Sequence, residues 1–481
     1  MQFNTFLYIL LFLPVTVIGW FAIGHFNNMA AKLFLIGMSL CFYAFAGLAG
    51  FKWFLISMAV NYSVVMLMKK RKSRITLWIG IVFNICILVY FKYTNFAITT
   101  INSLTHQNIS LLDNLVLPLG ISFFTFQQIS YLVDSYRGET KDNSLLDYIL
   151  YVVYFPKLLM GPIVKQKDLV PQFHKEIRPS SDHLIKGIQM FVTGLFKKVI
   201  MADTFSKAVT WAFGLSDWNA ATSMDLILVT LAYTFQIYFD FSGYSDMATG
   251  SAMMMNIVLP MNFDSPYKAY SIRDFWKRWH ISLTKFLTEY IYIPLGGSRK
   301  GKLRTYLNTM IVFLVSGFWH GANWTFVLWG ILHGLFSIFD RLTDKIRKNI
   351  HPVLQWIMTF SVVNILWLLF RCNSITQWKM ALLHIFAFHS TAISDDLIST
   401  FTNPEQTVLT KVLHLNPLTD HITGFWMLVF YILAFVMCLG FENAYRKKYS
   451  NHIITAILTA FLFIFTLTCI GSTSVFIYNN F

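Results

Sequence analysis

The sequence predicts an all-α integral membrane protein, and three observations support that fold class. Of its 481 residues, 56% are hydrophobic and only 13% are charged. A soluble domain carries about 25% charged residues, so this chain lacks the polar surface to face water on every side. Apolar runs recur from one end of the chain to the other, and the basic residues behind its net charge of +15 lie in short clusters between them. We therefore expect a single membrane domain over residues 1–481.

A helix needs about 20 mostly apolar residues to span a bilayer. About twelve segments qualify as spanning helices: 3–23, 31–48, 52–68, 75–93, 115–133, 184–202, 225–243, 305–319, 322–339, 352–371, 425–441 and 453–470. The first has no basic leader and no small-residue cleavage site, so we expect it to be retained as a span. Two further apolar stretches, 145–162 and 244–260, are broken by Gly and Pro.

The basic clusters predict how the spans are oriented, because Lys and Arg gather in cytoplasmic loops. Four clusters are expected in the cytoplasm: 69–74, 268–304, 341–348 and 446–448. Segments 94–114 and 372–424 are poor in Lys and Arg, and we expect both, the second as an extracytoplasmic loop, on the other side. The assignments agree only if 145–162 and 244–260 enter the membrane and return. Such backbone needs surrounding protein or a cavity, so the topology predicts a central cavity.

Several other classes of protein fit the sequence less well. The basic clusters between apolar spans suit anionic lipid headgroups, so nucleic-acid binding is not expected. The cysteines form no Cys-x-x-Cys pair, which argues against a disulfide framework or a zinc site: Cys41, Cys86, Cys372, Cys438 and Cys469. No Gly-rich phosphate loop, dinucleotide fingerprint or Gly-x-Ser-x-Gly elbow occurs, so a serine hydrolase is unsupported.

Residues 271–294, SIRDFWKRWHISLTKFLTEYIYIP, predict one helix lying in the membrane interface. Apolar residues recur there at helical spacing, with basic residues on the other face. Ser271 and Asp274 resemble a capping box, and Pro294 ends the helix. A plain interfacial helix, with Trp and Phe toward the lipid, explains every feature except His280. A histidine on such an apolar edge is more often packed than catalytic.

Two further histidines lie at membrane depth or at its edge. The sequences SGFWHG at 316–321 and WTFVLWGILHG at 324–334 contain His320 and His333, each followed by glycine. Ionisable residues at that depth are costly and usually functional. Imidazole suits proton transfer near neutral pH. The structural alternative is that both satisfy buried backbone carbonyls. A metal site is not expected, because no carboxylate or thiol lies at a helpful spacing.

Two other motifs are less specific. YFDFSGYSD at 238–246 places Asp240 and Asp246 in an apolar setting, and capping of a broken helix is their expected role. FPKLLMGP at 155–162 opens a basic run and predicts a Pro-bounded dip into the membrane, unless it only marks the flank of a span.

Taken in order, these motifs resemble the membrane-bound O-acyltransferase (MBOAT) family, and most closely its alginate and peptidoglycan O-acetyltransferases. Four segments within 139–340, which we expect to hold the catalytic core motifs, carry the resemblance: FPKLLMGPIVKQKDLVPQF (155–173), FDFSGYSDMATG (239–250), DFWKRWHISLTKFLTEYIYIPLGG (274–297) and FWHGANWTFVLWGILHG (318–334). The resemblance implies a ring of helices around a thin, tunnelled centre. It also implies that His320 is catalytic and that His280 is its companion.

The resemblance further implies an O-acyltransferase of the bacterial inner membrane. Its donor would be a cytoplasmic acyl thioester, acetyl-CoA or an acyl carrier protein, with no tightly bound cofactor. Its acyl group, acetyl in that branch, would pass to an envelope polysaccharide or to a periplasmic or membrane-anchored partner transferase. On this mechanism His320 takes the proton of the acceptor hydroxyl, while His280 hydrogen-bonds the oxyanion or orients the thioester.

The remaining substrate-binding candidates are of two kinds. Five lie within or beside the motifs: Trp319, Asn323, Trp276, Asp240 and His333. The others form the basic cluster that follows Gly296 and Gly297, where we expect donor phosphates to bind unless it is only a solvated loop: Arg299, Lys300, Lys302 and Arg304.

Two other functions stay open. D-alanyl transfer to teichoic acids, from a carrier protein, would use the same motifs. A proton-coupled secondary transporter would use the intramembrane histidines as a relay. No inverted repeat of the kind common in transporters is visible, and the ordered set of motifs favours the enzyme.

Overall fold

Within the residues that the structure describes, the chain consists of helices and their connections and holds no strand. The computed structural model describes residues 1–47, 50–113, 115–140, 144–414, 419, 422–446, 452–471 and 476–477. Its principal helices are α1 (Leu13–Phe26), α2 (Asn28–Ala46), α3 (Phe51–Lys70), α4 (Arg74–Thr105), α5 (Ile121–Arg137), α6 (Leu145–Val153), α7 (Phe155–Leu158), α9 (Ser181–Phe196), α10 (Asp203–Phe213), α11 (Ser223–Met254), α12 (Ile272–Arg278), α13 (Ile281–Leu287), α14 (Gly301–His320), α15 (Trp324–Leu342), α17 (Pro352–Arg371), α22 (Phe425–Phe435) and α23 (Ile453–Thr468). The predicted all-α fold class is confirmed.

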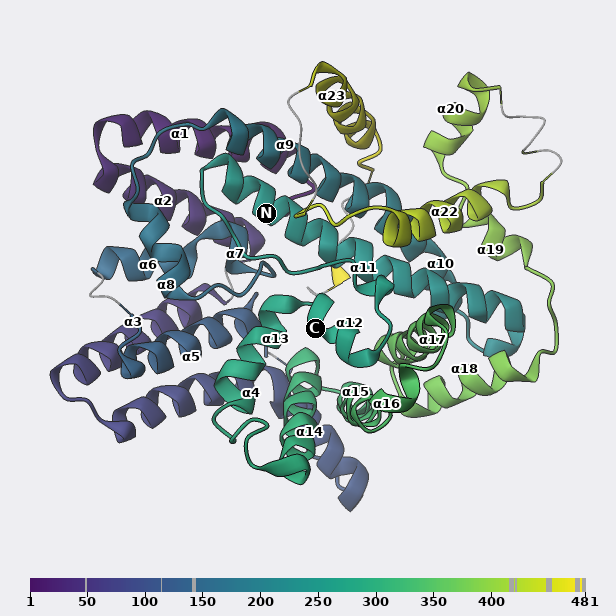
Figure 1. The fold of residues 1–481 in the computed structure, drawn as a ribbon, viewed down its shortest axis with the longest axis horizontal. Coiled ribbons are helices and arrows are strands. Elements are labelled where there is room, and N and C mark those ends of the chain that lie inside the picture. Colours follow the sequence, from purple (N-terminus) through teal and green to yellow (C-terminus); the bar gives the residue numbers. More distant parts are fainter. Residues whose placement is uncertain are drawn as a thin grey trace.

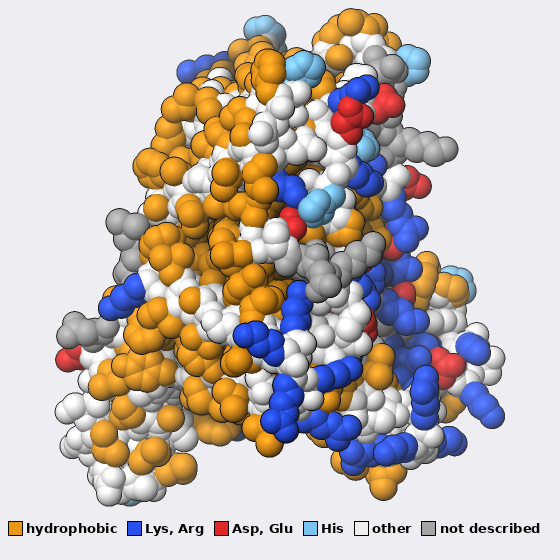
Figure 2. All heavy atoms as spheres, turned by 90° about the vertical axis from the view of Figure 1, so that its left-hand side faces the viewer, with side chains coloured by type: hydrophobic (Ala, Val, Ile, Leu, Met, Phe, Trp, Pro, Cys, Tyr) orange, Lys and Arg blue, Asp and Glu red, His pale blue; other side chains and the backbone are white. Residues whose placement is uncertain are grey.

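Seven of the described helical segments are long and apolar enough to cross a membrane: Leu7–Phe26, Asn28–Phe45, Phe51–Lys70, Arg74–Thr105, Ser223–Met254, Trp324–Leu342 and Pro352–Arg371. Figure 2 shows hydrophobic side chains over the left and centre of one side of the molecule, and Lys and Arg along its right and lower edges. An apolar belt beside a basic margin is the pattern of a multi-pass membrane protein. The count of about twelve spans stays a prediction.

Helix α11 is the central pillar of the molecule. Figure 1 shows it crossing the middle, with α9 beside it, α1 to α5 to the left and α14 to α17 at the lower right. Unlike the outer spans, α11 is buried along most of its length. The candidate active site lies on its flank, where aromatic rings of α5, α11 and α14 gather around His280.

The expected break in the chain between 225–243 and 244–260 is wrong, because α11 runs without interruption from Ser223 to Met254. Glycine serves close packing in this helix instead. A Cβ added to Gly250, within the stretch expected to be broken, would lie 2.6 Å from the carbonyl oxygen of Gly187 on α9. A Cβ added to Gly243 would lie 2.8 Å from the carbonyl oxygen of Gly194 on α9, so only glycine lets the two backbones approach this closely. Residues 244–254 of the second expected dip are therefore helical, and the chain leaves the helix after Met254.

The same close contact corrects the role expected for two carboxylates. Asp240 and Asp246 lie inside α11 and cap no break. Asp246 pairs with Lys197 at 2.6 Å and Asp240 with Lys198 at 2.7 Å, both lysines belonging to the helical turn η3 (Lys197–Ala202). All four side chains are buried. Each of these four buried charges thus has a partner of opposite sign, as a low-dielectric setting requires.

Residues 271–294 do not form the single helix that their spacing predicts. Helix α12 ends at Arg278 and α13 begins at Ile281, while His280 adopts left-handed backbone with φ of 44°. The N-cap is as expected, since the Ser271 hydroxyl accepts from the amide of Asp274. The Trp and Phe rings face protein rather than lipid, because Phe275 and Trp279 are fully buried.

Other boundaries differ from expectation in informative ways. The stretch 145–162 is interrupted as predicted, with α6 and α7 meeting at Tyr154. Helix α4 continues to Thr105, so half of the expected loop 94–114 is helical. The described part of segment 372–424, expected as an extracytoplasmic loop, contains the helices α18 (Ile375–Ala387), α19 (Asp395–Ser399) and α20 (Pro404–Val412). The side of the membrane on which these segments lie stays a prediction.

The buried pair between α11 and η3 yields a stability prediction. Replacing Lys197 with Met leaves the Asp246 carboxylate buried without a counter-charge, which should cost about 3–5 kcal/mol of the free energy of unfolding. Thermal unfolding in detergent measures the loss. The double variant Lys197→Met/Asp246→Leu should recover most of it. The exposed Lys285→Met is the control, expected to cost less than about 0.5 kcal/mol. A double variant no more stable than the single one would contradict this account.

Candidate active site

The two histidines of the candidate site come from different helices and meet at one tryptophan. His320 is the last residue of α14, and His280 precedes α13. The ring of Trp319 lies 4.9 Å from that of His320 and 6.0 Å from that of His280, between ring centroids. Both histidines are buried, with 3% and 0% of their surface exposed. The structure therefore brings together the residue expected to be catalytic and its expected companion.

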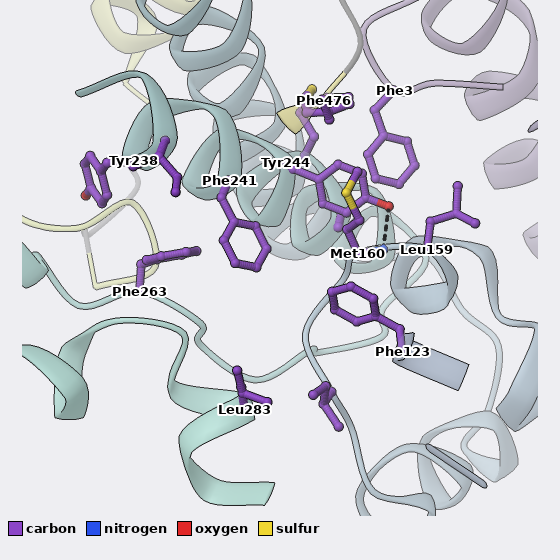
Figure 3. Packing of buried hydrophobic residues seen from close by; sticks show 14 of the residues in the cluster. Phe3, Phe123, Leu159, Met160, Tyr238, Phe241, Tyr244, Phe263, Leu283 and Phe476 are labelled. Carbon is purple, nitrogen blue, oxygen red and sulfur yellow. Dashed lines mark hydrogen bonds between the residues drawn. The ribbon is translucent and has the colours of Figure 1, made fainter. Parts of the chain in front are cut away.

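Aromatic rings enclose both imidazoles. Trp329 of α15 and Phe370 of α17 lie 5.0 and 5.3 Å from His320. Around His280, Phe241 of α11 lies 4.8 Å away and Phe123 of α5 lies 6.5 Å away. Figure 3 shows Phe123 and Phe241 reaching from opposite sides into the same space beside Leu283 and Met160. These walls exclude water, which strengthens any electrostatic interaction inside the site.

The close crossing of α14 and α15 explains how His320 is placed inside the protein. A Cβ added to Gly317, one turn before it, would lie 2.5 Å from the carbonyl oxygen of Phe326 on α15. The glycine therefore lets α14 and α15 cross in contact next to the site. The chain then turns at Asn323, whose side chain accepts from the amide of Thr325 and donates to the carbonyl of Asn373. Asn323, a substrate-binding candidate, is thus seen in a helix-capping role.

The third histidine is held by a tryptophan. The indole Nε1 of Trp276 donates to Nδ1 of His333 at 3.1 Å. Because the indole nitrogen can only donate, Nδ1 of His333 is an acceptor. The rings of His333 and Trp329 lie 4.6 Å apart, so His333 packs against the same tryptophan as His320. If His333 had a purely structural role, the sequence predicted a backbone carbonyl as its partner. The partner observed is the side chain of Trp276.

A half-buried lysine that the sequence motifs did not single out completes the site. Lys92 of α4 donates from Nζ to the carbonyl of Trp319 at 2.7 Å, to that of His320 at 3.1 Å and to the hydroxyl of Ser122 at 3.3 Å. A lysine inside an otherwise apolar span was the available signal, since such residues are functional by default. Its charge lies at the C-terminal end of α14, where a cation offsets the helix dipole.

Two pockets approach the histidines from different elements. The first, of about 90 Å³, is lined by Lys92, Trp319 and His320 together with residues 117–123. Residues 117–123 follow segment 94–114, which is expected outside the cytoplasm. The second, of about 270 Å³, has Trp276 in its wall and basic side chains around it: Arg273, Lys277 and Arg341. Those residues belong to the clusters expected in the cytoplasm.

The basic loop after Gly297 is only partly a loop, since Lys302 and Arg304 lie in the first turn of α14, and it lies apart from the histidines. About 27 Å of helix separate Lys302 from His320. The loop adjoins the second pocket, however, because Gly297 lies against the ring of Tyr292, which lines that pocket. Arg299 and Lys300 are exposed there. Asp240, the remaining candidate, is engaged by Lys198 and by the amide of Ile477 at 3.0 Å.

Three carboxylates gather at one place among the described residues. Asp134, Glu139 and Glu289 lie close enough to share a cation. Positive side chains already pair with them: Arg137, Lys165 and Lys167. The hydrogen bond from Lys167 holds the pKa of Glu139 below its ordinary value. The cluster is thus compensated by its own lysines and arginine.

Comparison with known proteins agrees with this geometry. The family described as MBOAT, membrane-bound O-acyltransferase family, matches residues 29–380. The chain is 35% identical to the peptidoglycan O-acetyltransferase of Helicobacter pylori, over 100% of this chain and 97% of that protein. It is 38% identical to the probable alginate O-acetylase of Pseudomonas aeruginosa, over 79% and 74% of the two chains.

The chain is also similar, more distantly, to a third protein. The chain is 25% identical to the teichoic acid D-alanyltransferase of Bacillus subtilis, over 52% of this chain and 66% of that protein. The family match covers most of the chain and includes both histidines. The chain therefore belongs to the membrane-bound O-acyltransferase family, and it is a multi-pass membrane enzyme that transfers acyl groups to hydroxyl oxygen.

Proposed function

We propose that this enzyme moves an acyl group, acetyl by analogy with its most similar relatives, from a cytoplasmic thioester to a cell-envelope polysaccharide or to a partner transferase. Its place would be the bacterial cytoplasmic membrane. The observation that carries the proposal is the position of His320, which lines one pocket and lies, through Trp329 and His333, near the tryptophan that lines the other. A base between two openings suits a reaction whose substrates arrive from opposite sides.

The reaction needs one proton to move. The acceptor oxygen attacks the acyl carbon, a C–O bond forms, and the C–S bond of the thioester breaks. His320 takes the hydroxyl proton during the attack and returns it to the departing thiolate, a contribution of about 10²–10⁴-fold. A thioester is already activated, so the rest of the site must supply orientation and a dry setting.

Charge that develops on the carbonyl oxygen needs a hydrogen-bond donor. The indole N–H of Trp329 is buried beside His320 and has no hydrogen-bond partner among the described residues. An indole nitrogen can only donate, so it suits an oxyanion and not a proton acceptor. Lys92 adds positive charge and fixes the backbone of Trp319 and His320.

Donor identity and acceptor identity rest on separate arguments. The basic loop beside the second pocket suits the phosphates of acetyl-CoA or of a carrier-bound pantetheine. D-alanyl transfer to teichoic acids would use the same histidines, but the relative with that name is less similar and matches about half of this chain. Family membership answers the transporter alternative in favour of the enzyme.

The role of His320 predicts a severe loss in its variants. His320→Gln should lower turnover by about 10²–10⁴-fold, because no other group takes the hydroxyl proton. Acyl content of the envelope polymer in a complemented deletion strain and turnover of the purified enzyme are the measurements. His384→Gln, a histidine of α18 that contacts the carbonyl of Ala221, is the matched control with unchanged activity. Wild-type acylation by His320→Gln would refute the role.

The basic loop predicts a selective effect on the donor. Charge reversal at Arg299, Lys300 and Lys302 together should raise the apparent KM for the thioester and leave acceptor dependence unchanged. The dependence of donor binding on salt should also weaken, since exposed charge pairs are screened. Reversal of another exposed basic set, Lys70, Arg71 and Lys72, is the control. Equal donor kinetics in the two triple variants would mean that the loop is a lipid-facing patch.

Lys92 predicts a defect in turnover rather than in binding. Lys92→Met removes a half-buried charge and three hydrogen bonds beside His320, so kcat should fall at least about tenfold with little change in either KM. Lys92→Arg keeps the charge and should recover part of the rate. The control is Lys157→Met, at a fully buried lysine that donates to Gln127 and lines neither pocket. A full rate in Lys92→Met would limit this lysine to a structural role.

A further inference from the structure

The backbone around His280 is held by the extended segment 262–264, which contains none of the sequence motifs. The amide of Ile281 donates to the carbonyl of Asn262 at 2.9 Å, and the amide of Asp264 donates to the carbonyl of Arg278, also at 2.9 Å. These two bonds bracket the left-handed residue. A left-handed non-glycine residue costs about 1–3 kcal/mol and persists only where its surroundings fix it.

The side chain of Asn262 determines which nitrogen of His280 carries the hydrogen. Asn262 Oδ1 accepts from the backbone amide of Ser282 at 3.3 Å and from its hydroxyl at 2.8 Å. A backbone amide can only donate, so the Asn262 atom that faces it must be the oxygen. The same oxygen lies 3.0 Å from Nδ1 of His280. Nδ1 therefore carries the hydrogen, and in the neutral ring Nε2 is a bare acceptor.

The assignment is reinforced from a further segment. The Ser282 hydroxyl donates to Asn262 and accepts from the amide of Ile163 at 3.0 Å, so its direction is fixed too. Nε2 of His280 is buried and has no hydrogen-bond partner among the described residues. The neighbouring rings of Phe241 and Phe123 have no hydrogen-bonding atom to offer it. A buried polar atom without a hydrogen-bond partner lowers the free energy of unfolding by about 1–3 kcal/mol unless a ligand bonds to it.

We propose that Asn262 is a positioning residue that fixes His280 with Nε2 as an acceptor, and that Nε2 binds an amide N–H of a pantetheine-type thioester. The proposal rests on the proposed function. A bare nitrogen cannot donate to an oxyanion, which leaves orientation of the thioester as the role of His280. The thioester itself offers only acceptors, and the hydroxyl hydrogen passes to His320. The hydrogen that Nε2 accepts must then come from the amide next to the thioester.

A pair of matched donors tests this assignment on the full-length enzyme in nanodiscs. S-acetyl-N-acetylcysteamine carries the amide, and S-(2-acetoxyethyl) thioacetate replaces its N–H with an ester oxygen at the same length. Wild-type enzyme should prefer the amide donor by about fivefold to tenfold in kcat/KM, the worth of one hydrogen bond. Asn262→Asp still presents an oxygen to Ser282 and His280, and should keep the preference.

Two variants should lose the preference while still using both donors slowly. Asn262→Leu frees the ring to place its hydrogen on either nitrogen, and His280→Phe keeps the ring contacts but removes Nε2. Asn308→Leu is the matched control, a buried asparagine that donates to the carbonyl of Gly297 at 2.9 Å, and should keep the preference. Either of the two loss variants suffices if the other does not fold.

The outcomes separate this inference from the proposed function. Use of both donors at equal rates by the wild type, or a retained preference in His280→Phe, overturns the assignment of Nε2 and leaves acyl transfer intact. No turnover of either thioester by the wild type overturns the proposed function, and the inference with it. A preference present in the wild type and in Asn262→Asp, and absent from Asn262→Leu, supports both.

Discussion

Everything in this structure depends on the fact that a bilayer offers no hydrogen-bond partner. Polar groups at membrane depth must be satisfied by the protein itself. The pairs of Lys197 with Asp246 and Lys198 with Asp240 meet that requirement between α9–η3 and α11, and the close approach allowed by Gly194 and Gly243 brings those partners together. The pillar that results is what the reactive segments pack against.

The same constraint explains how an irregular segment survives in the interior. Between α11 and α14 the chain turns repeatedly, and His280 adopts backbone that a helix would not allow. Its neighbours are satisfied by Asn262 and, through Ser282, by Ile163 of the FPKLLMGPI segment. Motifs about 120 residues apart in the sequence are thus parts of one hydrogen-bonded unit, and each is needed to hold the others in place.

Some residue types indicate their structural role from the sequence alone, and others do not. Composition and run length predicted the all-α membrane fold, and the histidine motifs predicted His280 and His320, which the structure brings together. Glycine was ambiguous, because one residue type marks both a broken helix and a close crossing, as at Gly243. The break at His280 has neither Gly nor Pro to announce it, and it arises from tertiary partners such as Asn262 that no local pattern reveals.

The two histidines of the site have different surroundings, and this difference assigns them different work. His280 is oriented through its ring by an amide oxygen, which fixes one tautomer. His320 is oriented through its backbone by Lys92, while its ring lies among Trp319, Trp329 and Phe370. On the proposed mechanism, both histidines act on the thioester and on one hydroxyl proton, and neither contacts the rest of the acceptor. Selection of the polymer would on that mechanism fall to the pocket bordered by residues 117–123 or to a partner beyond it.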